Sequence, residues 1–409
     1  MKILNFGSCN IDYVYSLDHI VAEGETETTE RLETFPGGKG LNQSVALAKA
    51  GAKVYHAGCV GEDGGMLTSV LAENGVDISL IKAVEGKNGH AIIQVSKEGK
   101  NSIFLYPGSN EMVSKEYVDS VLENFEKGDV ILLQNEISNI KYIVETAYKK
   151  GMSIFLNPSP FNEKVEELNF DMLSCIVLNE VEAKAISGLD GVSENVSYFR
   201  ERFPKLRVML TLGENGCVYF DKSSEIKQNA FRVKAVDTTA AGDTFTGYFI
   251  TGLSAGVPIE TVLKTASAAS AISVSRMGAA PSIPLMEEVA GAVLSMEENI
   301  SDSKEERILK STERYISENL ASANLSGLAE VLGYSAVYSG TLVKKITGKS
   351  FSALVQEKRC EFAAKMLTET EKPICDIIGI AGYENESFFR KKFFDKYGVN
   401  PLEYRKKRR

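Results

Sequence analysis

Short runs rich in β-branched and apolar residues alternate with helical stretches over the first 300 residues of this 409-residue chain. Strands are expected at residues 3–7, 53–59, 91–95, 130–134, 153–156, 175–178, 208–211 and 217–220. Helices are expected between many of them, for example at residues 42–50, 141–150 and 181–186. Because this alternation is typical of βαβ units, it predicts an α/β domain built on a mostly parallel sheet.

The composition is that of an ordinary globular protein, with 44% hydrophobic and 25% charged residues. These fractions exclude collagenous, coiled-coil and disordered classes. No stretch approaches the roughly 18 apolar residues of a membrane span, and the sequence after Met1 is strand-like rather than a secretory signal. The six cysteines are scattered without zinc or redox spacing, a pattern typical of reduced thiols in a cytoplasmic protein.

Charge divides the chain into two parts. Residues 303–409 hold 20 Lys+Arg against 14 Asp+Glu, a net +6, whereas residues 1–302 hold 26 against 41, a net −15. The polar segment 295–306 separates an α/β pattern from a helical one. We therefore expect a domain at 1–298, a linker at 299–306 and a second domain at 307–409, whose basic charge suggests a different partner.

The helical part contains an internal repeat. One apolar face consists of Leu325, Leu328, Ala329 and Leu332, and a second, 49 residues later, of Ile374, Ile377, Ile378 and Ala381. Each face is followed by Gly-Tyr and a second helix that ends near Gly348 or Gly398. This pattern predicts two helix-turn-helix units that bind DNA. The alternative is a pair of helical hairpins that serve oligomerisation and have no DNA role.

Residues 307–409 resemble the DNA-binding domain of AraC-type regulators, through the sequences at 328–333, 347–351, 387–393 and 397–405. The resemblance implies an all-α domain whose two units are joined by a helix at about 351–367. The implied DNA-facing residues are Ser335, Val337, Tyr338, Thr341, Lys344 and Lys345 in the first unit, and Glu384, Asn385, Ser387, Arg390 and Lys391 in the second. Asn385 suits adenine and Arg390 or Lys391 suits guanine. Gly340 interrupts the first recognition helix, at a cost of roughly 1 kcal/mol, so the second unit is expected to read bases.

The segment 236–245, Val-Asp-Thr-Thr-Ala-Ala-Gly-Asp-Thr-Phe, carries the sharpest chemical signal. The small residues Ala240, Ala241 and Gly242 allow backbone N–H groups to face an anion at the start of a helix expected at 244–253. Asp243 would normally be interpreted as a helix-dipole partner. Beside a phosphate it suits a general base that removes the proton of an attacking hydroxyl. No Walker motif is present, which excludes a P-loop kinase.

Two further groups of polar residues precede this segment. Residues 7–12 and 37–43 combine carboxylate, amides and glycines that suit a ligand with several hydroxyls, although 37–43 could equally form an ordinary tight turn. Asn179 and Glu182 share one face of a helix start and could reach a metal-bound water. Singly, they are more often a helix cap and a solvated charge. Residues 211–216 follow a strand, where nucleotide phosphates commonly lie.

Together, residues 7–12, 37–43, 237–245 and 278–284 resemble the ribokinase-like (PfkB) carbohydrate kinases, over essentially all of 1–295. The resemblance implies a three-layer α/β/α domain with a small β-lid, here residues 89–110, which pairs subunits into dimers. Asp243 would be the general base and Ala240, Ala241 and Gly242 the anion hole. The implied sugar ligands are Asn10, Ile11, Asp12, Gly38, Lys39, Gly40, Leu41, Asn42 and Glu136.

The same resemblance implies ATP, Mg²⁺ and K⁺ as cofactors. The implied ATP residues, with Gly242 and Asp243, are Asn179, Thr211, Leu212, Gly213, Glu214, Asn215, Gly216 and Ser267. Ser267 departs from the His or Asn that is common on the adenine side. Asn179 and Glu182 would organise Mg²⁺ through water. The implied K⁺ residues, several through backbone carbonyls, are Asp237, Thr239, Ser273, Arg276, Gly278 and Ser282.

The sequence thus predicts a cytoplasmic homodimer that phosphorylates a sugar, with D-ribose to D-ribose 5-phosphate favoured, and that binds double-stranded DNA as a sugar-responsive regulator. Two alternatives stay open: a catalytically silent sugar sensor, and a kinase for another sugar or a nucleoside. No membrane partner is expected.

Overall fold

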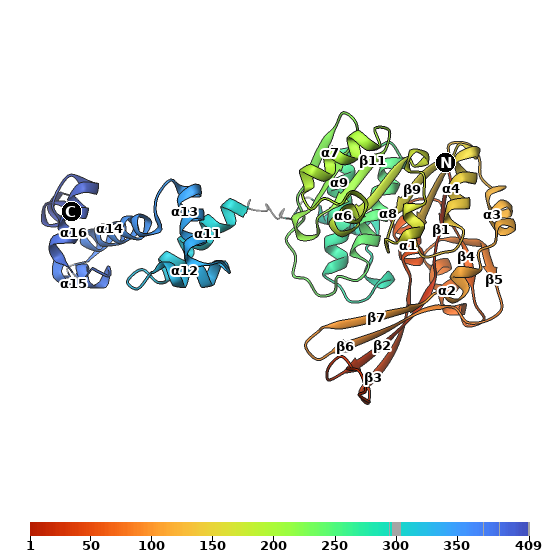
Figure 1. The fold of residues 1–409 in the computed structure, drawn as a ribbon, viewed down its shortest axis with the longest axis horizontal. Helices are drawn as coiled ribbons and strands as arrows, with labels where there is room; N and C mark the ends of the chain where they lie inside the picture. Colours follow the sequence, from red (N-terminus) through yellow and green to blue (C-terminus); the bar gives the residue numbers. More distant parts are fainter. Residues whose placement is uncertain (294, 297–303, 371, 384, 408–409) are drawn as a thin grey trace. The chain divides into compact units, whose positions relative to one another are not determined.

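The computed structural model describes residues 1–293, 295–296, 304–370, 372–383 and 385–407. The chain divides into two compact units, Met1–Ile300 and Ser301–Arg409 (Figure 1). Helix α11 begins at Lys304, so the last three residues of the segment expected as a linker are helical. Most of that segment lies outside the described residues, as do the DNA-facing candidate Glu384 and the last two residues of the basic terminus.

A mostly parallel sheet forms the centre of the first unit. Its order within the described residues is β13-β12-β11-β10-β9-β8-β1-β4-β5, and only the β11–β12 and β12–β13 pairs are antiparallel. The strands are β1 (Ile3–Phe6), β4 (Val54–Val60), β5 (Asp77–Ala83), β8 (Val130–Gln134), β9 (Ser153–Asn157), β10 (Cys175–Asn179), β11 (Arg207–Thr211), β12 (Cys217–Phe220) and β13 (Glu225–Gln228). The parallel α/β prediction is confirmed.

Both faces of this sheet are covered because its strands are apolar on both sides. In β1, Ile3 belongs to one buried core, whereas Leu4 and Phe6 belong to the other. The first core is covered by α1 (Lys39–Lys49), α2 (Gly65–Glu73), α8 (Ala241–Ser254), α9 (Ile259–Val274) and α10 (Met286–Ala292). The second is covered by α3 (Lys115–Leu122), α4 (Ile140–Lys150), α5 (Glu163–Glu166), α6 (Glu180–Ser187) and α7 (Val192–Arg202). The predicted three-layer arrangement is therefore correct.

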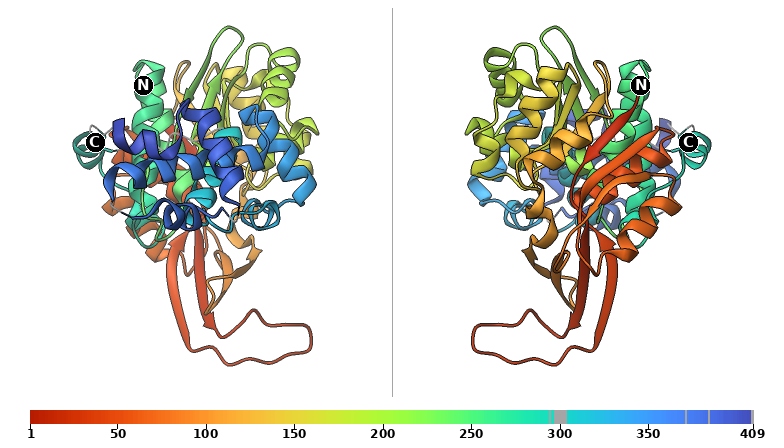
Figure 2. Two further views of the ribbon diagram at one scale, coloured as in Figure 1. Left: turned by 90° about the vertical axis from the view of Figure 1, so that its left-hand side faces the viewer. Right: turned by 90° about the vertical axis from the view of Figure 1, so that its right-hand side faces the viewer.

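A second sheet, here called the lid sheet, extends away from the layers of the first unit (Figures 1 and 2). Its order is β3-β2-β6-β7, from β2 (Asn10–Leu17), β3 (Arg31–Gly37), β6 (Gly89–Ser96) and β7 (Asn101–Tyr106). Asn10 lies opposite both Gly37 and Gly89, so the sugar-site motifs meet at the base of this sheet. Strands β6 and β7 agree with the expected lid, whereas β2 and β3 were not predicted as strands.

Helices alone make up the described part of the second unit. They are α11 (Lys304–Glu318), α12 (Leu325–Leu332), α13 (Ala336–Thr347), α14 (Phe351–Glu369), α15 (Ile374–Ile380), α16 (Glu386–Tyr397) and α17 (Pro401–Lys407). Two separate cores lie along α14, which contributes Phe351 and Val355 to one and Cys360 and Leu367 to the other. Gly333 and Gly382 turn the chain at φ of 70° and 84°. The predicted tandem helix-turn-helix architecture is confirmed.

None of the described helices is both long enough and apolar enough to cross a bilayer.

Candidate active site and DNA-binding surface

The amino end of α8 presents backbone N–H groups. The helix begins at Ala241, earlier than the expected start at residue 244, and Ala240 precedes it in a left-handed conformation with φ 59°. This conformation is sparsely populated by residues other than glycine, and it turns the chain sharply into the helix. In the first turn, the N–H groups of Gly242 and Asp243 have no acceptor within the helix. Such N–H groups can bind an anion, and the anion site expected from the motif stays a prediction.

Asp243 lies in this first turn and is almost completely buried, with 8% of its surface exposed. Its Oδ2 accepts a hydrogen bond of 3.1 Å from Asn42 Nδ2, and its Oδ1 accepts one of 2.8 Å from Gln43 Nε2. Helix α8 can approach α1 closely because Gly247 has no side chain: a Cβ there would lie 2.4 Å from Cβ of Ala46. Packing of α1 on α8 thus joins the motif at 37–43 to the motif at 237–245.

The other predicted sugar residues surround the start of α1. Glu136 accepts hydrogen bonds from the backbone N–H of Lys39, at 3.0 Å, and from the Ser8 hydroxyl. Asn10 Oδ1 accepts from Asn110 Nδ2 at 2.7 Å, and Gly37 leaves room for the Asp12 carboxylate. Ser8 and Asn110 were missed as site residues, although both stand within segments that the sequence singled out.

Asn42 has an unsatisfied acceptor, because its Oδ1 is buried without a hydrogen-bond partner. A hydroxyl of a bound ligand would satisfy that oxygen, which fits a polyhydroxylated ligand. Ile11 and Leu41 differ from the expectation, since both side chains belong to the buried core of the first sheet face. These two residues can contact a ligand only through the backbone. Gly38 and Gly40 have no side chains, and Cβ atoms there would meet the backbone of residues 7–10.

Burial and crowded carboxylates set the electrostatics of this site. Burial, with a smaller contribution from Glu136, raises the pKa of Asp12 to about 7. Burial, assisted by Asp243, also raises the pKa of Glu136, although Lys39 and Ser8 act against it. For the Lys39 ammonium, burial acts to lower the pKa, but Asp243, Glu136 and Glu182 together raise it. Lys39 therefore stays charged among three acidic side chains.

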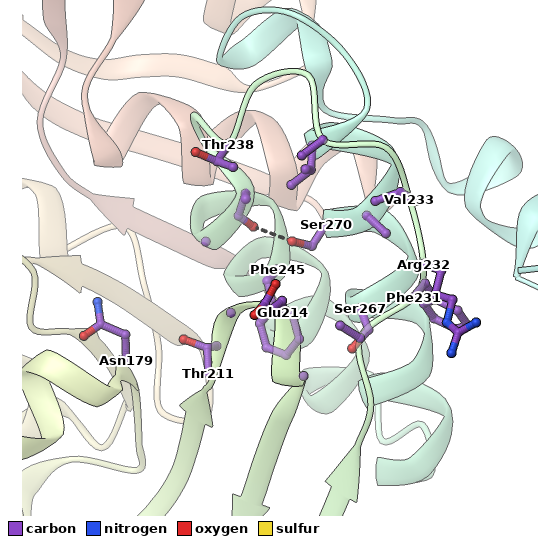
Figure 3. A pocket seen from close by; sticks show the side chains of 18 residues that line it. Asn179, Thr211, Glu214, Phe231, Arg232, Val233, Thr238, Phe245, Ser267 and Ser270 are labelled. Atoms are coloured by element: carbon purple, nitrogen blue, oxygen red, sulfur yellow. Dashed lines mark hydrogen bonds between the residues drawn. The ribbon is translucent and has the colours of Figure 1, made fainter. Parts of the chain in front are cut away.

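Two neighbouring cavities, of about 220 and 700 Å³, share Asn179, Thr211, Ala241 and Gly242 among their walls. The smaller cavity is also lined by Lys39, Glu182, Ala240 and Asp243. The larger cavity is lined by the predicted nucleotide residues Gly213, Glu214, Gly216 and Ser267 (Figure 3). The start of α8 therefore lies where the two cavities meet.

Some residues of the larger cavity differ from the prediction. Leu212 packs against the second core instead, and Asn215 is not among the residues that line the cavity. Phe231, Arg232 and Val233, which come from the irregular segment after β13, form part of its wall (Figure 3). Nothing in the local sequence of that segment marked it. Ser270, also missed, donates a hydrogen bond of 3.0 Å to the carbonyl of Ala241.

Asn179 and Glu182 form a reciprocal cap on α6. Asn179 Oδ1 accepts from the Glu182 N–H at 2.9 Å, and Glu182 Oε2 accepts from the Asn179 N–H at 3.0 Å. The helix-cap interpretation is therefore correct. The solvated-charge interpretation of Glu182 is wrong, because that side chain is 6% exposed and borders the smaller cavity.

The predicted potassium residues come from the segment before α8, from the last turn of α9, which contains Ser273, and from the segment after α9. Asp237 Oδ1 accepts from the Thr239 N–H and hydroxyl at 2.9 and 2.6 Å, and Oδ2 accepts from the Gly278 N–H at 2.9 Å. Burial acts to raise the pKa of Asp237, but these bonds lower it overall. The hydroxyls of Ser273 and Ser282 pair with each other at 2.7 Å. Arg276 pairs with Glu288 at 2.6 Å, so only its backbone could face a cation.

In the second unit, the predicted DNA-facing residues within the described part are exposed on α13 and α16 or cap them. Ser335 and Asn385 cap these helices by accepting from the N–H groups of Tyr338 and Phe388. Arg390 binds Glu386 of its own helix through two hydrogen bonds, of 2.6 and 2.8 Å. Helix α13 is continuous through Gly340, where a Cβ would lie 3.2 Å from Leu325 Cδ2. The glycine thus serves close packing of α12 on α13.

Comparison with known proteins gives the same division. Residues 1–286 match the pfkB family carbohydrate kinase model, and residues 328–407 match a helix-turn-helix domain model of the AraC type. The ribokinase of Haemophilus influenzae is 36% identical over 292 residues, which cover 69% of this chain and 95% of that protein.

Solved structures agree with this comparison. A ribokinase structure from Thermotoga maritima has a TM-score of 0.64 at 35% identity and covers 72% of this chain and 99% of that one. The structure of Arabidopsis thaliana ribokinase complexed with ribose and ATP has a TM-score of 0.63 at 27% identity and covers 71% and 98%. The chain therefore belongs to the pfkB family of carbohydrate kinases, which are phosphotransferases, and carries an AraC-type helix-turn-helix domain in its second unit.

Proposed function

We propose that the first unit transfers the terminal phosphoryl group of ATP to a hydroxyl of D-ribose, giving D-ribose 5-phosphate, and that the second unit binds specific DNA sequences. One observation carries the catalytic part. The Asp243 carboxylate lies in the first turn of α8, where the backbone N–H groups of that turn face the junction of the two cavities. A base and an anion site are thus held within one helical turn.

In this proposal, the sugar occupies the space near Asn10, Asp12 and Asn42, and the nucleotide occupies the larger cavity. Asp243 takes the proton from the attacking sugar hydroxyl. The N–H groups at the start of α8 and the Lys39 ammonium bind the charge that develops on the transferred group. Family resemblance and the neighbour complexed with ribose and ATP support these assignments.

The chemistry of the donor residues fits the two implied cations. Glu182 is a buried carboxylate beside the smaller cavity, and Mg²⁺ prefers carboxylate oxygens and water. Asn179 and Glu182 would hold Mg²⁺ through water, and the ion would supply charge neutralisation for the phosphates. The two segments that contain Asp237 and Thr239, and Gly278 and Ser282, offer carboxylate, hydroxyl and carbonyl oxygens, a hard donor set that suits K⁺.

We propose ribose and not another sugar because the relatives at 33–36% identity are named ribokinases. The decisive measurement is ADP release with ribose and Mg-ATP at high potassium concentration, beside a panel of deoxyribose, fructose and nucleosides. Turnover with ribose supports the proposal. Sugar-induced thermal stabilisation without ADP release in any arm would instead support a silent sensor.

The DNA-binding part is supported by the helix-turn-helix match and by the exposed basic residues of α13 and α16. Because both units belong to one chain, we propose that the protein is a sugar-responsive regulator. DNA affinity measured with and without saturating ribose, ribose 5-phosphate and ATP tests it. An affinity that none of these ligands alters would remove the regulatory part while leaving the kinase intact.

The same proposal includes a homodimer formed through the lid sheet. Strand β7 is an edge strand whose six residues are all exposed, among them Ile103, Phe104, Leu105 and Tyr106. An exposed apolar edge of this kind favours pairing with a second strand.

A protein that uses both ATP and DNA is also expected to work in the cytoplasm.

A further inference from the structure

A chain of buried side-chain amides lies directly behind Asp243. Gln43 Nε2 donates to Asp243 Oδ1 at 2.8 Å and to Asn157 Oδ1 at 3.2 Å. Gln43 Oε1 accepts from Gln134 Nε2 at 2.7 Å, and Gln134 also donates to Asn5 Oδ1 at 2.9 Å. Asn5, Gln43 and Gln134 have no exposed surface. Every side-chain nitrogen and oxygen of these three residues has a hydrogen-bond partner except Gln134 Oε1. Buried networks whose bonds are made hold their members in one arrangement.

Backbone carbonyls fix the direction of this chain at both ends. Asn5 Nδ2 donates to the Gly40 carbonyl at 2.7 Å, so Asn5 must present its oxygen to Gln134. Asn157 Nδ2 donates to the Val177 carbonyl at 2.8 Å, so Asn157 must present its oxygen to Gln43. Since a carbonyl oxygen can only accept, both ends require Gln43 to turn its N–H groups toward Asp243.

The branch beyond Asn5 leads to a neutral histidine. Asn5 Nδ2 also donates to Ser44 Oγ at 2.8 Å, and Ser44 contacts His56 Nδ1 at 2.8 Å. Burial lowers the pKa of His56 to about 4, so this histidine carries no charge at neutral pH. The network therefore supplies direction to Gln43 without placing a second titrating charge behind the base.

We propose that Gln43 is a positioning residue for phosphoryl transfer, which occupies Oδ1 of Asp243 and leaves Oδ2 as the oxygen that receives the sugar proton. Oδ2 is held by Asn42 at 3.1 Å, and the buried Oδ1 of Asn42 lacks a partner. A sugar hydroxyl that reaches this point can donate to Oδ2. This inference rests on the proposed role of Asp243 as the base.

The test is the substitution Gln43→Met, which keeps the length of the side chain and removes its N–H groups. We expect kcat to fall about 10- to 100-fold, the scale of a misplaced catalytic group. The KM values for ribose and ATP should stay within about twofold, because neither ligand contacts Gln43 in this proposal. Gln134→Met removes the donor to Gln43 Oε1 and Asn5 Oδ1 but leaves the Gln43 N–H groups in place, so it should give a smaller fall. Gln356→Met in α14 of the second unit is the matched control and should leave kcat unchanged.

A second variant separates positioning from packing. Gln43→Glu places a carboxyl against Asp243, so its kcat at neutral pH should fall below that of Gln43→Met. As the pH falls, the protonated carboxyl can donate to Asp243, and the ratio of its kcat to wild type should rise, whereas the Gln43→Met ratio stays flat. Lys39 of α1 and Glu136 after β8 are charged groups near Asp243, and Glu182 of α6 lies on the wall of the same cavity. All three are common to every variant.

Wild-type kcat in Gln43→Met would overturn the inference. An equal loss of kcat in both Gln43 variants at every pH, in proportion to their loss of thermal stability, would also overturn it. Asp243→Asn tells this failure from that of the proposed function. If Asp243→Asn is inactive and Gln43→Met is fully active, only the positioning role is wrong. If Asp243→Asn is as active as wild type, the base assignment itself is wrong.

Discussion

The Asn42 side-chain amide donates a 3.1 Å hydrogen bond to the carboxylate of Asp243, 201 residues further along the chain. One residue belongs to the motif that suits a hydroxylated ligand, and the other to the motif that suits a phosphate. Their contact depends on the packing of α1 on α8, where Gly247 lies against Ala46. The fold therefore brings these two motifs together at one carboxylate.

Replacement of Asp243 by asparagine should lower kcat at least about 10³-fold, because the variant loses the proton acceptor while the anion site stays in place. Asn42 has an unpaired oxygen that can accept from the new amide, so the variant should fold. Steady-state ADP release measures kcat, and thermal unfolding with ribose checks that the site still binds. Turnover equal to wild type would refute the base assignment.

Stability should depend on pH through Asp12. Its pKa in the folded protein is about 7, against a usual value near 4, because burial and Glu136 disfavour the ionised form. The native state therefore loses stability as the pH rises from about 4 through about 7, and the full cost is present above that range. Asp12→Asn removes the cost, so it should raise the unfolding temperature of the ligand-free protein at pH 8 but not at pH 4.

Asp18, just past the end of the same strand, provides the matched control. A hydrogen bond from Lys97 lowers the pKa of its carboxyl, so Asp18→Asn should bring no gain in unfolding temperature at pH 8. Asp12→Asn should also weaken the stabilisation by ribose, since Asp12 is a proposed sugar ligand. An equal unfolding temperature for wild type and Asp12→Asn across the pH range would contradict the assigned cause of the pKa shift.

The parts that were predictable from the sequence are those whose signal is local. The strand at 130–134 starts with four consecutive apolar residues and is buried throughout, and its bounds agree with β8. Strands β2 and β3 were missed because the lid sheet has no continuous buried face: β3 contains Pro36 and is mostly exposed. Pairing between distant segments, not side-chain alternation, defines those strands.

The same distinction holds at the site. Asp243 and Gly242 stand in one short motif, whereas the roles of Gln43, Gln134 and Asn157 depend on the order in which β1, β8 and β9 lie side by side. No spacing rule connects these amides in the sequence. The segment at 230–233 lines the larger cavity only because it follows an edge strand of the sheet, which a single sequence does not reveal.

The proposed dimer predicts a specific effect of charge on β7. Leu105→Asp places a carboxylate on the exposed edge of the lid sheet, where Leu105 is 54% exposed, and should convert the dimer to monomer. Leu285→Asp is the control, because Leu285 is 52% exposed and precedes α10, where aspartate is a favourable cap. Sedimentation equilibrium measures both. A dimer that survives Leu105→Asp would place the interface elsewhere.

The ion pair between Arg390 and Glu386 gives the DNA-binding surface an internal competitor. Both side chains are exposed on α16, so the pair contributes little stability. The Glu386 carboxylate would, however, repel DNA phosphates, and it binds the Arg390 guanidinium that the DNA would otherwise bind. Glu386→Gln should therefore raise affinity for a duplex selected from a random library, whereas Arg390→Ala should weaken it by about 1–3 kcal/mol. Anisotropy titrations at several salt concentrations measure both effects.

Glu318→Gln is the control, because it breaks a similar exposed ion pair, Arg314–Glu318, on α11. This substitution should leave the affinity for DNA unchanged. A gain as large as that of Glu386→Gln would show that net charge alone, and not the surface of α16, controls binding.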